Sequence, residues 1–377
     1  MGFADLKRSC LKIVVDDRIP FISGVLESFA DVIYLPGGAI SPGLIRDADA
    51  LIVRTRTRCD EKLLANSKVR FIATATIGFD HLDVQYLQKV GIAWSNAPGC
   101  NASSVAQYIV SALATAEVDF LGKTLGVIGV GNVGSKVAAM GKTLGMRVIL
   151  NDPPRAEREN NANFTGLAEL LRDSDFVTLH TPLTDDGKYP TRCLCNAKFL
   201  AQMKNSAQLF NTSRGEVVDS GTLIAALKTK TIAGAVLDVW EDEPGINREL
   251  LNSVRLGTPH IAGYSGDGKA NGSAMVIQAL AKFFGIDQLS NWTFGNLPKP
   301  KNPTIVINSE LPEAQQLRQA LLHSYNICED DLKLRHDPAG FEAQRGNYPV
   351  RREYGAFTVQ GGSEQVRKTL RQLGFTC

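Results

Sequence analysis

Several features that mark special classes of protein are scarce in this sequence. The seven cysteines are an odd number without a Cys-x-x-Cys pair, which argues against a disulfide framework and a structural zinc site. No apolar run reaches the length of a bilayer crossing, and residues 1–17 contain no apolar signal core. The net charge of +2 gives no argument for nucleic acid or anionic membrane as a partner. We therefore expect a soluble cytoplasmic protein with no metal, nucleic-acid or membrane partner.

The remainder of the chain alternates short apolar runs with helical patterns. Among the first hundred residues the apolar runs are 11–17, 31–37, 50–57 and 69–77, and helical patterns follow them at 20–30, 43–48, 59–67 and 81–91. A long helical pattern at 101–120 precedes six further apolar runs, at 124–130, 146–152, 175–182, 207–213, 232–240 and 254–262. Nearly continuous apolar strands that alternate with helices are typical of parallel sheets covered on both faces. The sequence thus predicts an α/β protein.

A change of composition near residue 290 separates the last part of the chain. Residues 290–303 are rich in Pro, Gly, Asn and Lys, as linkers are. The patterns beyond this segment indicate a small α+β domain. We expect three parts: 1–100, completed by about 270–289; then 101–269; and finally 290–377.

The stretch GVIGVGNVGSKVAAMG contains a G-x-G-x-x-G pattern formed by Gly129, Gly131 and Gly134. The pattern follows a predicted strand and opens a predicted helix, and Asp152 ends the next strand 18 residues beyond Gly134. This context indicates a Rossmann-type dinucleotide site, in which the glycines allow a tight turn, a close pyrophosphate and close helix packing. A glycine-rich turn without a ligand is the alternative. Since a carboxylate at position 152 would accept from ribose hydroxyls and repel a 2′-phosphate, NAD is favoured over NADP.

Three strands of the second series end in polar residues that are out of keeping with their apolar character. Arg214 follows one strand, an acidic turn from Asp238 to Glu243 follows the next, and His260 ends the last. Ligands of open α/β sheets bind at the carboxyl ends of strands, so these side chains can converge on one cleft. A helix-capping arginine, a solvated acidic turn and a core histidine are the structural alternatives. Convergence explains all three positions together.

The motifs now resemble those of a known family. The glycine pattern with NDPP, NTSRGEVVD, LDVWEDEP and TPHIAGY is similar to the D-2-hydroxyacid dehydrogenase family, from the first strand to about residue 285. The resemblance implies two doubly wound parallel-sheet domains, a flavodoxin-like substrate domain at 1–100 with about 270–289 and a Rossmann-type NAD-binding domain at 101–269. It implies that Arg214, Glu243 and His260 are catalytic. The cofactor contacts that it implies are Gly129, Gly131, Asn132, Val133, Gly134, Asp152, Thr181, Thr212, Ser213, Arg214, Asp238 and Gly263.

These residue types suit the oxidation of a 2-hydroxy acid, which removes a hydride from C2 and a proton from its hydroxyl group. Histidine is the natural proton acceptor near neutral pH, so we expect His260 to be the acid/base. Glu243 would fix the tautomer of the ring and stabilise the imidazolium. The planar fork of Arg214 suits a carboxylate.

A closer resemblance covers nearly the whole chain. The segments 97–102, 180–191, 258–270 and 347–357 look like those of a branch of the family that oxidises 4-phospho-D-erythronate to (R)-3-hydroxy-2-oxo-4-phosphobutanoate with NAD, in bacterial pyridoxal 5′-phosphate (vitamin B6) biosynthesis. The resemblance implies a homodimer joined through the C-terminal domain, 290–377. It also implies substrate contacts by Thr55, Thr76 and Tyr264. The alternatives are a 3-phosphoglycerate dehydrogenase or another D-2-hydroxyacid dehydrogenase, and an NAD-sensing binding protein without turnover.

A phosphorylated substrate needs cationic partners, for which the sequence offers several candidates. Arg54, Arg56 and Arg58 share one face if the run at 50–57 continues as a strand, although arginines also protect exposed strand edges. The other candidates are Lys269, Arg351 and Arg352, of which the last two could equally form a salt bridge across a dimer.

Overall fold

The structure is a computed structural model that describes residues 11–116, 120–160 and 163–377. The chain forms two compact units, one of Met1–Asn101 with Gly266–Leu297 and one of Ala102–Ser265 with Pro298–Cys377. Residues 1–10, which belong to the opening expected to hold no signal, and residues 117–119 of the expected helix at 101–120 lie outside the described part. Within the described ranges, no helix is long and apolar enough to cross a membrane.

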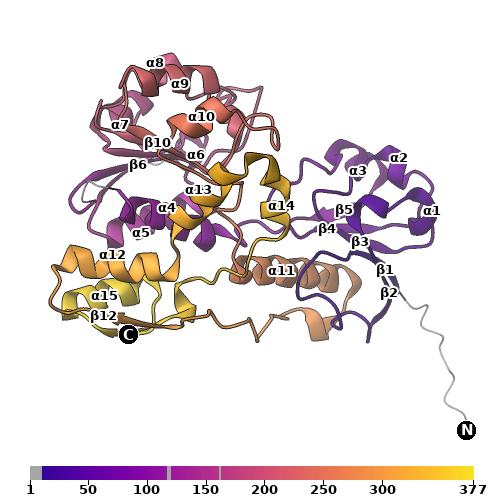
Figure 1. Cartoon of the computed structure of the whole chain (residues 1–377). Helices are drawn as coiled ribbons and strands as arrows, with labels where there is room; N and C mark the ends of the chain where they lie inside the picture. Colours follow the sequence, from indigo (N-terminus) through magenta and orange to yellow (C-terminus); the bar gives the residue numbers. More distant parts are fainter. Residues whose placement is uncertain (1–10, 117–119, 161–162) are drawn as a thin grey trace, which may run out of the picture. The chain divides into compact units, whose positions relative to one another are not determined.

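The first unit contains a five-stranded parallel sheet of order β2-β1-β3-β4-β5, which confirms the flavodoxin-like prediction. Strands β3 and β4 are buried along their whole length, as expected for a sheet covered on both faces (Figure 1). The strands are β1 (Leu11–Asp16), β2 (Ala30–Leu35), β3 (Ala50–Val53), β4 (Phe71–Thr74) and β5 (Ala93–Ser95). The helices are η1 (Gly37–Ala39), α1 (Pro42–Ile45), α2 (Glu61–Leu64), α3 (Val84–Val90), α11 (Gly266–Phe284) and η3 (Asp287–Leu289).

Two local predictions in this unit are wrong. The helical pattern at 20–30 forms a series of turns instead, because Phe21 and Gly24 have φ values of 63° and 83° and interrupt the helical hydrogen bonds. Strand β3 ends at Val53, so the arginines that follow it do not share one face of a strand. Arg54 instead turns back to Asp16, with its Nε 3.3 Å from Oδ2.

The second unit is built on a six-stranded parallel sheet of order β11-β10-β9-β8-β6-β7. The strand order reverses between β6 and β8, which makes the switch point of a Rossmann-type sheet and confirms that prediction. The strands are β6 (Thr124–Ile128), β7 (Arg147–Asn151), β8 (Phe176–Leu179), β9 (Gln208–Asn211), β10 (Gly234–Leu237) and β11 (Leu256–Gly257). The helices are α4 (Ala102–Ala114), α5 (Asn132–Thr143), α6 (Pro153–Glu159), α7 (Leu167–Asp173), α8 (Ala197–Leu200), η2 (Gly215–Val217), α9 (Ser220–Lys228) and α10 (Arg248–Ser253).

The C-terminal segment belongs to the second unit and shares its core. A two-stranded parallel sheet packs with α12 and α15, which lie beside α4 and α5 (Figure 1). Apolar side chains of both parts, among them Val105, Leu113, Leu321 and Leu370, form one buried cluster. The elements are β12 (Thr304–Ile307), α12 (Glu313–Ser324), α13 (Ile327–His336), η4 (Pro338–Gly340), α14 (Phe341–Gly346), η5 (Tyr354–Ala356), β13 (Thr358–Gly361) and α15 (Glu364–Leu373).

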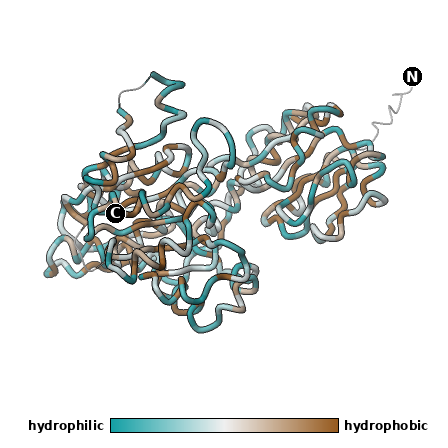
Figure 2. Tube along the Cα trace, turned by 90° about the horizontal axis from the view of Figure 1, so that it is seen from above, coloured by the Kyte–Doolittle hydropathy of each residue, from teal (hydrophilic) through white to brown (hydrophobic). Residues whose placement is uncertain are grey.

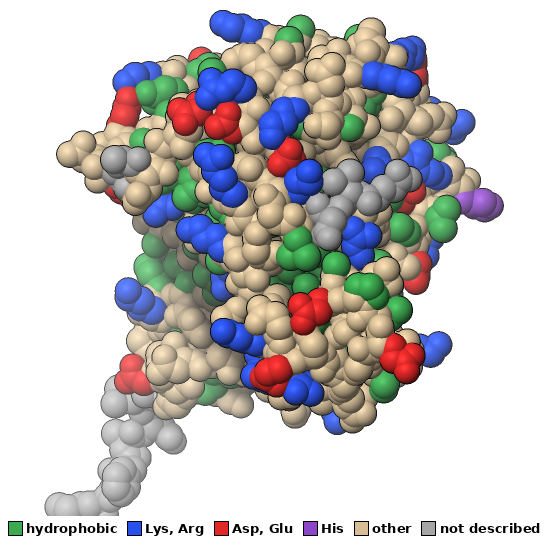
Figure 3. Space-filling view, turned by 90° about the vertical axis from the view of Figure 1, so that its left-hand side faces the viewer, with side chains coloured by type: hydrophobic (Ala, Val, Ile, Leu, Met, Phe, Trp, Pro, Cys, Tyr) green, Lys and Arg blue, Asp and Glu red, His purple; other side chains and the backbone are tan. Residues whose placement is uncertain are grey.

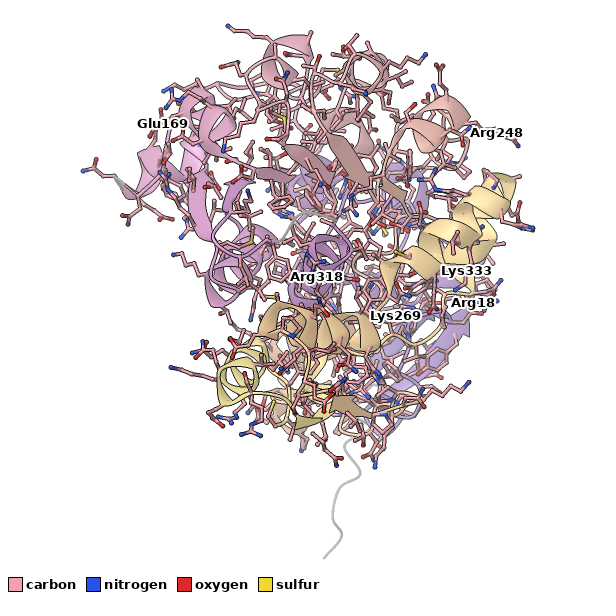
Figure 4. All side chains as sticks on the ribbon, turned by 60° about the vertical axis from the view of Figure 1, so that its left-hand side comes forward. Arg18, Glu169, Arg248, Lys269, Arg318 and Lys333 are labelled. Carbon is pink, nitrogen blue, oxygen red and sulfur yellow. The ribbon has the colours of Figure 1, made fainter. Side chains whose placement is uncertain are left out.

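Polar contacts also fix α13 to the Rossmann sheet. The backbone N–H of Gly257 in β11 donates to Asp331 at 2.7 Å, and Arg335 holds the same carboxylate through its Nε. The guanidinium of Arg335 donates to the carbonyls of Leu251 and Val254 at the end of α10. The labels of Arg318 and Lys333 mark α12 and α13 in Figure 4.

Hydrophobic stretches of the trace run through the interior of each unit (Figure 2). On the face drawn in Figure 3, Lys and Arg side chains are interspersed with Asp and Glu.

Candidate active site

The loops after β10 and β11 bring an imidazole and a carboxylate together. The Nδ1 atom of His260 lies 2.7 Å from Oε2 of Glu243, and the second oxygen of Glu243 accepts from the N–H of Trp240 at 2.9 Å. The His260 side chain keeps 32% of its surface exposed, against 19% for Glu243. The carboxylate therefore fixes one face of the ring, while Nε2 remains available for proton transfer.

A buried polar network shapes the loop that carries His260. The carboxylate of Asp238 accepts from the backbone N–H groups of Ile261 and Ala262 at 2.7 and 2.8 Å. The same carboxylate accepts from the Thr258 hydroxyl at 2.7 Å. The Thr258 hydroxyl also lies 2.7 Å from the phenol oxygen of Tyr108 on α4. Asp238 is 1% exposed, so its hydrogen bonds are buried and fix the conformation of the loop.

His260 itself has left-handed backbone geometry, with a φ of 57°. This conformation is uncommon for a residue with a side chain and stores strain. The N–H of His260 donates to the carbonyls of Asp238 and Thr258 at 2.7 and 3.0 Å, which compensates for the strain. The network thus holds the ring in a conformation that a free loop would rarely adopt.

The acidic groups of the loop respond differently to burial. Burial alone would raise the pKa of Glu243, but the hydrogen bond and charge of His260 and the Trp240 N–H outweigh it, and the pKa is lowered. Glu243 is thus ionised at neutral pH. For Asp238 burial dominates and raises the pKa, although His260, Thr258 and the two loop N–H groups oppose the shift.

The turn after β9 carries Arg214 against the same loop. Asn211 organises this turn, since its Oδ1 accepts from the N–H of Ser213 at 3.0 Å and its Nδ2 donates to the carbonyl of Arg214 at 2.8 Å. A Cβ atom at Gly215 would lie 2.0 Å from the carbonyl carbon of Trp240. Glycine at position 215 therefore lets the turn with Arg214 approach the loop with Glu243.

The glycine loop after β6 forms the space that a pyrophosphate needs. Gly129 has a φ of 82°, and a Cβ there would meet the carbonyl oxygen of His180 at 2.7 Å. A Cβ at Gly134 would lie 2.0 Å from the carbonyl oxygen of Gly129, so helix and strand touch. At Gly131, which begins the helix α5 as its N-cap, a Cβ would meet nothing within 4 Å. This open position in front of free helical N–H groups, followed by exposed Asn132 and half-buried Val133, fits an anionic cofactor.

The neighbouring strand end completes the fit to a dinucleotide. The hydroxyl oxygen of Thr181 is buried without a hydrogen-bond partner in the described part of the chain. Burial lowers the pKa of His180 to about 3, so its ring is neutral, and the ring lies 3.3 Å from the Thr212 hydroxyl. Asp152 directly follows β7 and accepts from the N–H groups of Val130 and Arg155 at 2.8 and 3.0 Å. Of the predicted cofactor residues, Gly129, Asp152 and Thr181 thus lie just beyond the ends of β6, β7 and β8, the strands on either side of the switch point.

The predicted substrate contacts lie in different surroundings. Tyr264 follows the His260 loop and packs against Tyr348, with ring centroids 6.1 Å apart. In the first unit, Thr55 is exposed in the turn after β3, and the Thr76 hydroxyl donates to the carbonyl of Gly78 at 2.7 Å.

Most of the predicted phosphate-binding cations have other partners in the structure. Arg54 pairs with Asp16, and the Nε of Arg58 lies 3.2 Å from Asp60. Arg351 is 7% exposed and donates to the carbonyls of Ser104 and Ala262, at 3.4 and 2.5 Å. The structure places a different cation, Arg345 of α14, beside Tyr264, a residue that the sequence motifs do not indicate.

The fold and this arrangement define an NAD-binding dehydrogenase of 2-hydroxy acids. Residues 101–262 match the NAD binding domain of the D-isomer specific 2-hydroxyacid dehydrogenases, and residues 296–374 match a domain of unknown function, DUF3410. The D-lactate dehydrogenase of Aquifex aeolicus, solved with NAD and lactic acid, is 26% identical, with a TM-score of 0.59 over 76% of this chain and 100% of that one. The chain is thus an NAD-dependent oxidoreductase that acts on CH–OH groups.

Curated relatives specify the family further. The erythronate-4-phosphate dehydrogenase of Bacteroides thetaiotaomicron is 48% identical over 358 residues, which are 93% of this chain and 99% of that protein. The enzyme of the same name from Cronobacter sakazakii is 41% identical over 374 residues, 97% of this chain and 98% of that protein. The chain belongs to the erythronate-4-phosphate dehydrogenase family.

Proposed function

We propose that this chain oxidises 4-phospho-D-erythronate at C2 to (R)-3-hydroxy-2-oxo-4-phosphobutanoate with NAD, in the biosynthesis of pyridoxal 5′-phosphate. Relatives with the corresponding name match it over nearly their full length, at 39–48% identity. The observation that carries the chemistry is the 2.7 Å contact between His260 and Glu243. An imidazole that a carboxylate orients is suited to accept the proton of the C2 hydroxyl group.

Each of the three proposed catalytic residues acts through its own polar group. The Nε2 of His260 takes the proton from the C2 hydroxyl, and Glu243 stabilises the resulting imidazolium through Nδ1. Arg214 binds the substrate carboxylate and polarises the C2 oxygen with its planar guanidinium. The chemistry that bound NAD supplies is acceptance of the hydride from C2.

The proposed cofactor contacts begin with the glycine loop after β6. Gly131, Asn132, Val133 and the N-terminus of α5 would hold the pyrophosphate. The carboxylate of Asp152 would accept from the ribose hydroxyls of the dinucleotide. The Thr181 hydroxyl, which has no partner among the described residues, would donate to or accept from the same cofactor. The remaining proposed contacts are Gly129, Gly134, Thr212, Ser213, Arg214, Asp238 and Gly263.

The wider organisation is part of the same proposal. We propose a substrate domain of residues 1–100 with about 270–289, an NAD-binding domain of 101–269 and a dimerisation domain of 290–377. We also propose that Thr55, Thr76 and Tyr264 contact the substrate.

The six described cysteines are free thiols, which supports a reducing cytoplasmic location. A homodimer would sediment at twice the chain mass of 40.8 kDa at micromolar concentration, whereas a monomer there would overturn the dimer.

The His260→Ala variant tests the proposal. We expect the kcat for 4-phospho-D-erythronate to fall about 100-fold or more, because the general acid/base is lost, while NADH still binds. Stopped-flow or steady-state NADH formation measures the first quantity, and NADH fluorescence titration the second. His336→Ala, an exposed histidine at the end of α13, is the control and should keep normal turnover. Near-normal kcat in His260→Ala would refute the assignment.

A further inference from the structure

A guanidinium from the C-terminal segment lies beside the candidate active site. Arg345 is the next-to-last residue of α14, and its Cζ atom lies 5.8 Å from the ring centroid of Tyr264 and 5.9 Å from that of Phe341. Tyr264 is only four positions after His260 in the loop that the Asp238 network holds. The contact with Tyr264 is within the range of a cation–π interaction, so it places the guanidinium in a defined position.

The segment that follows α14 fixes this position further. Tyr348 packs edge-on against Tyr264, and its hydroxyl donates to Asp330 at 2.6 Å. The backbone of Arg351 forms a bridge with Ser265, and the carboxylate of Glu353 accepts from the Ser265 hydroxyl at 2.9 Å. Several contacts therefore hold residues 345–353 beside the His260 loop.

Arg345 retains donors for an anion. Among the residues that the structure describes, its Nη1 donates to Glu342 at 3.2 Å, while its buried Nε has no hydrogen-bond partner. The side chain is 23% exposed, so it is partly desolvated yet still reachable. Burial lowers the pKa of Arg345, but Tyr264, Glu243, Glu342 and Asp238 raise it above its ordinary value. The group is therefore a permanent cation within the electrostatic range of the catalytic Glu243.

We propose that Arg345 binds the terminal phosphate of the substrate and so determines that the enzyme acts on a phosphorylated hydroxy acid. This inference rests on the proposed function and deepens it. The substrate has an anion at each end, with C2 next to the carboxylate and the phosphate beyond C3 and C4. Two arginines of the second unit match these ends: Arg214 on the β9 turn takes the carboxylate, and Arg345 on α14 takes the phosphate.

The other arginines of this segment are less suited to the task. Arg351 is only 7% exposed, and its guanidinium lies 4.2 Å from the centroid of the Tyr325 ring. Its Nε and Nη1 are buried without partners among the described residues, but its Nη2 donates to two backbone carbonyls. Arg352 donates to the carbonyl of Pro298. Arg351 thus stabilises the loop that contains Ala262, whereas Arg345 is the cation that lies against Tyr264.

The test compares substrates with and without the phosphate. We measure kcat and KM with NAD for 4-phospho-D-erythronate and for D-erythronate, in wild type, Arg345→Gln and Arg345→Lys. If D-erythronate turns over too slowly, its inhibition constant against 4-phospho-D-erythronate replaces its KM. We expect Arg345→Gln to raise KM for the phosphorylated substrate about 10- to 100-fold and to leave the constants for D-erythronate within about 3-fold. Arg345→Lys should recover part of the loss, since it restores charge without the fork.

The control is Arg367→Gln on α15, where Arg367 pairs with Glu364 three positions before it, as Arg345 pairs with Glu342. It should leave both substrates unaffected. An equal loss on both substrates in Arg345→Gln would overturn the phosphate role, because a merely structural or electrostatic role moves them together. A wild type that prefers D-erythronate or oxidises neither acid would instead refute the proposed function itself.

Discussion

His260 shows how much of the chain is needed to present one side chain. Its φ of 57° is unfavourable, yet its N–H is held by two carbonyls and the next two N–H groups by Asp238. Strain of about 1–3 kcal/mol is usual for such a conformation, and a few buried hydrogen bonds offset it. Asp238 is in this sense a positioning residue for the ring as well as a proposed cofactor contact.

The carboxylate of Glu243 can be tested at the same scale. Its two oxygens accept from two donors, the Trp240 N–H and the His260 ring. Glu243→Gln offers one acceptor oxygen and a second donor, so one bond is lost. We expect the variant to lose about 1–3 kcal/mol of unfolding free energy at pH 7, and kcat to fall about 10-fold or more. Urea unfolding and steady-state kinetics measure the two effects.

The pH dependence of that loss follows from the sign of the shift. The folded pKa of Glu243 lies below its usual value near 4.5, so its stabilisation is fully present above the unfolded pKa and lost as pH falls through the folded one. The difference between wild type and Glu243→Gln should therefore shrink below about pH 4.5. A difference that does not change with pH would contradict this account. Glu241→Gln, in the same loop, should keep normal kcat.

At the scale of elements, the site depends on how closely three turns approach one another after β9, β10 and β11. Gly215 is where the first two touch, since any Cβ would overlap the Trp240–Glu241 peptide. We expect Gly215→Ala to displace the Arg214 turn, to cost about 1–3 kcal/mol and to lower kcat/KM at least about 10-fold.

The control for this prediction is Gly221→Ala in α9, where the new Cβ would meet its nearest atom at an ordinary 3.6 Å. Alanine should be neutral or slightly stabilising there, because it is the better helix former. Thermal unfolding and kcat/KM of the two variants provide the comparison. A Gly215→Ala enzyme with wild-type activity and stability would show that the two turns do not need this close approach.

The elements also show what a sequence can predict. The apolar runs predicted both parallel sheets because a strand that is buried on both faces needs near-continuous aliphatic residues. The glycine pattern, Arg214, Glu243 and His260 carry local signals, and the structure brings the acid and the base together. The prediction at 20–30 was wrong because its apolar spacing suits a helix, whereas the left-handed backbone of Phe21 and Gly24 interrupts the helical hydrogen bonds.

Arg345 illustrates the other limit. No motif surrounds it, α14 has only six residues, and its importance depends on contact with a loop about 80 positions earlier. Only tertiary packing could reveal it. The sequence could not predict the hydrogen bonds of Asp238 for the same reason, because its three donors come close to it only once the loop is folded.

At the scale of the molecule, the C-terminal segment is part of the catalytic unit. It shares a buried apolar cluster with the Rossmann domain, and Asp331 and Arg335 tie α13 to β11 and α10. The same segment supplies Arg345 and Tyr348 beside Tyr264. A segment with such contacts influences the site directly, whatever it does in a dimer.

The most direct test of the whole account is the specificity of the wild-type chain between two phosphorylated acids. Steady-state oxidation of 4-phospho-D-erythronate and of 3-phosphoglycerate should be measured with NAD, by following the oxoacid product as well as NADH, so that a cofactor that stays bound is not mistaken for inactivity. The account predicts a kcat/KM that favours 4-phospho-D-erythronate by about 100-fold or more. A preference for 3-phosphoglycerate, or binding of NADH without oxidation of either acid, would contradict it.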